Sequence, residues 1–135
     1  MQAYFRTLAL VGGALTLGAA GAAAQEVHEI RMVEAGKGEF RFEPSSVSAE
    51  RGDILLFKAI SGAPHSVVFE GRDLSADARQ KLNAALPRRA GDLSSPLLTK
   101  DAEYRVVVPE LAAGTYRFFC LPHRAYDMRG QVTVK

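Results

Sequence analysis

Cysteine is the scarcest reactive residue in this 135-residue sequence, which contains only Cys120. A single cysteine cannot form a disulfide bond within its own chain, so the sequence excludes a fold held together by disulfides. Free cysteines are commonly small, buried, apolar residues. An unpaired cysteine in an exported protein can also be a reactive thiol or a metal ligand. The neighbouring residues decide between these interpretations.

Histidine and net charge are also in short supply. The sequence has three histidines, so any metal centre or catalytic centre must be built from a very small set. The formal net charge is only +2. Nucleic-acid-binding domains carry a basic stripe or patch, and a net charge so close to zero argues against one. We therefore do not expect a nucleic acid partner.

The first 24 residues differ in composition from the rest of the chain. Arg6 is followed by an uncharged run, residues 7–24, that is rich in Leu, Ala and Gly and ends in three alanines. This layout is typical of a secretory signal peptide and predicts cleavage after about Ala24. The run also approaches the minimum length of a membrane anchor, about 17 residues. Its small residues favour cleavage, so we expect a periplasmic or secreted domain of residues 25–135 without stable membrane insertion.

Short segments of alternating apolar and polar residues dominate the predicted mature chain. They are separated by turns containing Gly, Pro or Asp, as in all-β sandwiches and barrels. Residues 54–60 are almost continuously apolar, which predicts a central strand. The other predicted strands are residues 28–34, 39–43, 97–109, 116–120 and 131–134.

Residues 75–86 break this pattern and predict one short helix. Ser75 is a suitable N-cap, and apolar residues follow at helical spacing from Ala78 to Leu86 before Pro87. The loop after the helix contains Arg88 and Arg89. These arginines are either solvated or a small cationic docking patch for an acidic partner.

The densest concentration of metal-binding chemistry follows the strand at 116–120. Cys120, His123 and Met128 place a thiol, an imidazole and a thioether within nine residues. Soft sulfur beside nitrogen suits copper, and a His2Cys site with a weak axial Met is the blue-copper arrangement. Met128 alone would more often be a gap-filling core residue.

A second histidine must then come from elsewhere in the chain. His65 follows the turn at 62–64 and precedes the apolar run at 67–69, so it lies just before the start of a predicted strand. His28 lies in a polar stretch near the predicted mature N-terminus, where we expect it to be solvated. The predicted metal ligands are therefore His65, Cys120, His123 and Met128, although zinc would accept the same nitrogen and sulfur donors.

Two segments together resemble the copper-binding segments of cupredoxins, the small blue copper proteins. They are PHSVVF at 64–69 and GTYRFFCLPHRAYDM at 114–128, and the likeness extends to FRFEPSSVSAERGDILLF at 40–57. The resemblance implies a Greek-key β-sandwich or barrel that holds one type 1 copper ion. It also implies that His123 is the more exposed ligand, with Leu121, Pro122 and Ala125 forming an apolar docking patch around it.

The function that this resemblance implies is single-electron transport by Cu(I)/Cu(II) cycling. Expected partners are c-type cytochromes or a membrane or periplasmic oxidoreductase, which a monomer would meet transiently near His123. The alternative is a periplasmic protein that holds or delivers copper for an oxidase. Copper enzymes of this fold need further histidine clusters and domains, so we predict that the chain is not an enzyme. Ser66 stands where relatives commonly carry Asn, and Pro122 has no N–H, so we expect few hydrogen bonds to the Cys120 sulfur.

Overall fold

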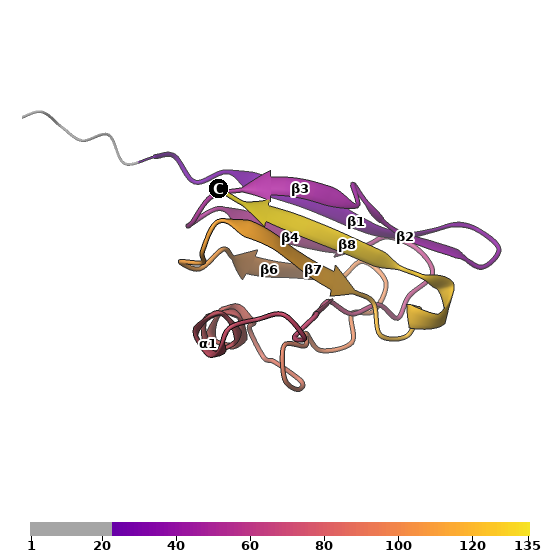
Figure 1. Ribbon diagram of the computed structural model, residues 1–135. Helices are drawn as coiled ribbons and strands as arrows, with labels where there is room; N and C mark the ends of the chain where they lie inside the picture. The colour runs from indigo at the N-terminus through magenta and orange to yellow at the C-terminus, as the bar shows by residue number, and fades with distance from the viewer. Residues whose placement is uncertain (1–22) are drawn as a thin grey trace, which may run out of the picture.

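The computed structural model describes residues 23–135 (Figure 1). The predicted signal peptide falls almost entirely outside these described residues. Two four-stranded sheets form a β-sandwich, with one helix in a connecting segment. The predicted fold class, an all-β sandwich with a short helical insert, is therefore confirmed. No helix among residues 23–135 is both long enough and apolar enough to cross a membrane.

The first sheet has the strand order β2-β1-β4-β6. β1 (Val27–Gly36) pairs antiparallel with β2 (Glu39–Glu43) and parallel with β4 (Ile54–Ala59), and β4 pairs antiparallel with β6 (Glu103–Val107). β4 has a neighbour on each side and is almost wholly buried, as its continuous apolar run predicts. The strand expected at 97–109 is wrong in length, because residues 97–102 form a loop before β6 begins.

The second sheet has the order β3-β8-β7-β5 and carries the cysteine. β3 (Ser46–Ala49) pairs parallel with β8 (Arg129–Val134), which pairs antiparallel with β7 (Gly114–Phe119). β5 (Val68–Phe69) completes the sheet beside β7. The loop between β7 and β8 contains Cys120, His123 and Met128, and the last pair of the β7–β8 ladder, Phe119 and Arg129, closes its base.

The core between the sheets is centred on Phe118 of β7. The rings of Phe42, Phe57 and Phe69 meet it edge to face at centroid distances of 4.9, 5.3 and 5.8 Å. Such edge-to-face pairs stabilise a core beyond the area that they bury. Gly130 lies opposite on β8, and a Cβ there would come within 2.4 Å of the Phe118 ring. β7 is therefore fixed two residues before Cys120.

The predicted helix is confirmed as α1 (Ala76–Ala85). The Ser75 hydroxyl accepts a hydrogen bond from the Ala78 N–H, and Ala78 and Leu82 are buried. In Figure 1, α1 lies beside β6 and far from the yellow loop between β7 and β8, so the helix itself flanks the sandwich away from that loop. Arg89 after the helix is exposed and donates to the Gly91 carbonyl, as expected for a solvated loop.

His28 is not the solvated terminal residue that the sequence predicts. The parallel pairing of β1 with β4 brings it beside Asp53, whose carboxylate lies 3.0 Å from His28 Nε2. The same carboxylate accepts hydrogen bonds from the backbone N–H groups of Glu26 and Glu50. These hydrogen bonds, Glu50 first, lower the pKa of Asp53 to about 2. His28 and Asp53 thus attach the start of β1 to the turn before β4.

Candidate metal centre

The two remote segments with the predicted ligands converge at one end of the sandwich. The Cys120 sulfur lies 3.4 Å from His123 Nδ1 and 3.7 Å from His65 Nδ1. His65, Cys120 and Met128 are fully buried, and His123 is 8% exposed. Three of the predicted ligands therefore present their donor atoms to one point, and the fourth is buried in the same loop.

The backbone and Ser61 fix the orientation of His65. His65 exchanges two backbone hydrogen bonds with Leu98, at 3.0 and 2.8 Å, just before β5. Its Nε2 lies 2.6 Å from the Ser61 carbonyl oxygen, which can only accept. Nε2 therefore carries the hydrogen, and Nδ1 keeps a lone pair directed towards Cys120. Hydrogen bonds of this kind set the tautomer of metal-binding histidines.

The β7–β8 loop is folded tightly by its own backbone. The Cys120 N–H donates to the Met128 carbonyl at 3.0 Å, and the His123 carbonyl accepts from the N–H of Tyr126 at 3.0 Å. A single turn of 3-10 helix, η1 (Arg124–Tyr126), separates His123 from Asp127, whose positive φ of 58° reverses the chain. Met128 is thereby returned to the level of Cys120 and buried there.

Ser66 connects the two segments at the cysteine. Its backbone N–H donates to the Cys120 sulfur at 3.4 Å, and its hydroxyl accepts from the Leu121 N–H at 2.9 Å. Two backbone N–H groups, those of Ser66 and His123, act on that sulfur, but among residues 23–135 only the Ser66 N–H lies within hydrogen-bond geometry of it, which agrees with the expectation of few such donors. The role of the hydroxyl could not be read from the sequence, because it depends on a residue 55 positions away.

Burial determines the protonation states of the site. It raises the pKa of the Cys120 thiol, and the backbone N–H groups of Ser66 and His123 oppose this shift only in part. Burial lowers the pKa of both His65 and His123. Two neutral imidazoles and a thiol are therefore the stable forms at neutral pH without a cation. A metal ion would displace the thiol proton, and both imidazoles would already be in the neutral form that binds a metal ion.

The spacing of the donor atoms fits a metal ion. Bonds of about 2.1 Å to nitrogen and 2.3 Å to sulfur, at angles of about 100–130°, place nitrogen and sulfur about 3.4–4.0 Å apart. The two observed distances, 3.4 and 3.7 Å, lie within this range. One thiolate with two imidazoles is also the donor set that suits copper.

Phe40 is a residue of the site that sequence reasoning missed. Its ring stacks on that of His123, with 3.6 Å between centroids and 10° between planes. Tyr126 meets the Phe40 ring at its edge. The alternation of Phe40 with Phe42 predicts only that both face the interior. His123 is the more exposed of the two histidines, as expected, but Phe40 covers one face of its ring.

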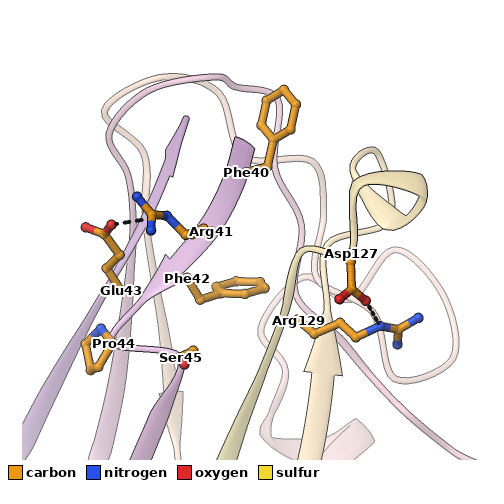
Figure 2. Close-up of a pocket in the computed structure, with 8 residues that line it drawn as sticks. All are labelled: Phe40, Arg41, Phe42, Glu43, Pro44, Ser45, Asp127 and Arg129. Carbon is orange, nitrogen blue, oxygen red and sulfur yellow. Dashed lines mark hydrogen bonds and ion pairs between the residues drawn. The ribbon is translucent and has the colours of Figure 1, made fainter. Parts of the chain in front are cut away.

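The surface near the loop has an apolar part and a hollow. Leu121 is 56% exposed, and Pro122 and Ala125 are also exposed, so the expected apolar patch is present. A hollow of about 250 Å³ lies between β2 and the start of β8. Figure 2 shows the side chains that line it, among them Asp127, which pairs with Arg129. None of the four predicted ligands lines this hollow, so the metal centre is closed rather than open to it.

Comparisons with known proteins agree with this geometry. Residues 30–135 match the family described as copper binding proteins, plastocyanin/azurin family. Plastocyanin of Capsella bursa-pastoris is 32% identical over 112 residues, which cover 76% of this chain and 96% of that protein. Chloroplastic plastocyanin of Pisum sativum is 35% identical over 106 residues, and the match spans 76% of this chain and just over half, 56%, of the pea protein.

Solved structures show the same fold. Oxidised plastocyanin from Dryopteris crassirhizoma superposes with a TM-score of 0.63 at 26% identity, covering 80% of this chain and all of that one. An amicyanin variant in its Cu(I) form superposes with a TM-score of 0.53 at 24% identity, covering 86% of this chain and 88% of that one. The matched family binds copper, and the donor set observed here is also one that suits copper.

Proposed function

This chain belongs to the plastocyanin/azurin family of copper-binding proteins, and on that premise we propose that it is an exported type 1 blue copper protein that carries single electrons between redox proteins. The observation that carries the proposal is the buried cluster of Cys120, His65 and His123. These three residues and Met128 would be the ligands that hold the copper ion. Copper, when bound, would supply the one-electron couple Cu(I)/Cu(II).

The contribution of the chain is a rigid, dry frame for that couple. Cys120 would bind as a thiolate after losing its proton, and the Ser66 N–H stabilises the negative sulfur. Ser61 holds His65 in one tautomer, and Phe40 holds the plane of the His123 ring. Because all these positions are fixed by packing and hydrogen bonds, the donors have little room to rearrange between oxidation states.

The apolar patch of Leu121, Pro122 and Ala125 supports transient docking next to His123. Three exposed residues offer far less area than a stable interface needs, and weak redox encounters lie at the small end of the range, below about 1,200 Å². The partners that we propose are c-type cytochromes or a membrane or periplasmic oxidoreductase. We propose that the protein acts as a monomer.

Export remains part of this proposal. Residues 23–26 are exposed and have no regular secondary structure before β1 begins at Val27. A signal peptidase would therefore find an accessible site after about Ala24, and cleavage there would leave β1 whole.

Copper delivery to an oxidase is the alternative function, and the burial of the site argues against it. A protein that hands over its metal needs open coordination, so that an acceptor can reach the ion. Here three of the predicted ligands are fully buried, and Phe40 covers a face of the fourth, His123, which is 8% exposed. This closed arrangement favours movement of electrons rather than movement of the ion.

The proposal is tested by adding Cu(II) to purified protein. We expect one copper per chain, an intense visible band from thiolate charge transfer, bleaching by ascorbate and recovery of the colour with one equivalent of ferricyanide. Cys120→Ala should lose the band, whereas Ser48→Ala, a change at an exposed position of β3, should keep it. Copper binding without the band, or transfer of the ion to a chelator within seconds, would refute the electron-carrier function.

A further inference from the structure

A charged groove of about 740 Å³ lies next to the metal centre, between β7 and the segment that contains α1. Its lining includes five arginines and three carboxylates, which leaves an excess of two positive charges. The whole sequence has a formal net charge of +2, so this one groove holds as large an excess as the entire chain. The five residues of this arginine groove are Arg72, Arg79, Arg117, Arg124 and Arg129.

Two of the five arginines are neutralised by partners within the groove. Arg79 pairs with Asp92 and also donates to the Gly71 carbonyl. Arg129 pairs with Glu70 at 2.6 Å. These pairs hold the walls together and contribute little net charge to the surface.

The other three arginines have no such partner. Arg72, Arg117 and Arg124 are exposed, and none of them forms an ion pair with another residue in the range 23–135. The guanidinium group of Arg124 lies 4.7 Å from the centre of the Phe119 ring, a cation–π contact that orders it over the groove. Asp73 is the one lining carboxylate left to offset them.

The arginine groove adjoins the proposed electron-transfer site. Phe119 directly precedes Cys120, and Arg124 directly follows His123. Leu121 of the apolar patch lies in the same loop and is 56% exposed. A protein bound over the groove would therefore also reach the surface beside the metal ligands.

We propose that the arginine groove docks an acidic surface of the redox partner, with acidic side chains of that partner pairing with Arg72, Arg117 and Arg124. This inference rests on the proposed electron-carrier function, and it specifies in addition that the docking surface of the partner is acidic. Opposite charges steer partners together and set the orientation in which they meet. Because the three arginines are exposed, salt should weaken the complex strongly. At physiological ionic strength the Debye length is about 8 Å, and attraction between exposed charges farther apart than this is largely screened.

The test measures binding of the Cu(I) protein to an oxidised plant-type ferredoxin, a small acidic electron carrier, by NMR shift perturbation at low and physiological salt. Oxidised ferredoxin is too weak an oxidant to take an electron from Cu(I), so binding is seen without a reaction. Reduced cytochrome c, a basic protein that cannot accept a further electron from Cu(I), serves as the probe of opposite charge. We expect shifts at Arg72, Arg117, Phe119 and Arg124 with ferredoxin, and none there with cytochrome c.

Charge reversal locates the site. The double variant Arg72→Glu/Arg117→Glu should weaken ferredoxin binding on the order of tenfold at low salt. Arg31→Glu/Arg105→Glu, an equal change of charge at exposed arginines of β1 and β6 in the other sheet, should change it less than twofold. Equal losses in both variants, or no shifts at the groove in the unaltered protein, would overturn the docking proposal. The copper colour and its recovery with ferricyanide test the electron-carrier function separately, so the two can fail independently.

Discussion

The ring of Phe40 lies parallel to the ring of His123, with 3.6 Å between their centroids, although the two residues are 83 positions apart in the chain. Phe40 belongs to β2 of the first sheet, and His123 to the loop that follows β7 of the second. The stacking therefore joins the two sheets at the metal end. It also shields the histidine of the proposed copper site that lies nearest to solvent.

Removing Phe40 should raise the pKa of His123 in the metal-free protein. Burial is the main reason that this pKa is low, and Phe40→Ala would expose one face of the imidazole to water. The pKa should therefore rise towards its ordinary value of about 6.5, as measured by NMR titration of the ring protons. His65, which is held by Ser61, should keep its pKa and serves as an internal control. An unchanged His123 pKa would show that Phe40 does not shield the ring.

Removing the Ser66 hydroxyl should affect both stability and the copper site. Ser66→Ala leaves the Leu121 N–H, whose hydrogen bond is partly buried, without its acceptor, which should cost about 0.5–1.5 kcal/mol of the free energy of unfolding. Loss of this tie next to Cys120 should also shift the visible band of the copper protein.

Ser95 provides a matched control for Ser66. Its buried hydroxyl accepts a hydrogen bond from the Val67 N–H at 2.8 Å, in a similar setting but without contact to Cys120. Ser95→Ala should cost a comparable free energy and leave the band in place. If both variants move the band equally, the Ser66 hydroxyl has no specific role at the site.

Asp53 should stabilise the metal-free fold in a pH-dependent way. Its pKa falls from 3.8 to about 2 in the folded chain, so its contribution is present above pH 3.8 and disappears as the pH falls through about 2. Asp53→Asn should lower the free energy of unfolding by up to about 2 kcal/mol at pH 6, from urea titrations. The difference between the two proteins should shrink towards pH 2, and a difference that is constant with pH would contradict this origin.

Gly130 should tolerate no side chain. Gly130→Ala places a Cβ within 2.4 Å of the Phe118 ring at the centre of the core, and overpacking of this kind costs about 1–3 kcal/mol. Gly91→Ala is the control, because nothing lies within 4 Å of its Cβ position and its φ is not positive. Thermal unfolding should show a lower midpoint for the first variant and little change for the second.

The sequence predicts much of this fold because period and spacing are local signals. The apolar run of β4, the capped helix after Ser75 and the spacing from Cys120 to Met128 can each be recognised within a dozen residues. The pairing of His65 with Cys120 was also predicted, because the chain offers so few histidines.

The remaining contacts depend on how the two sheets are placed. Alternation assigns Phe40 to a face of its strand but cannot show that this face ends against His123. The partnership of His28 with Asp53 likewise arises from parallel pairing of β1 with β4, which joins residues 25 positions apart. No local pattern encodes either contact.

X-ray absorption spectroscopy of the copper-loaded protein tests the central claim most directly. We expect two nitrogen ligands at about 2.0 Å and one short sulfur ligand at about 2.2–2.3 Å, with one nitrogen lost in His65→Ala and the sulfur lost in Cys120→Ala. His28→Ala should leave the spectrum unchanged. Copper surrounded only by nitrogen and oxygen, or a spectrum that does not respond to His65→Ala, would contradict the account.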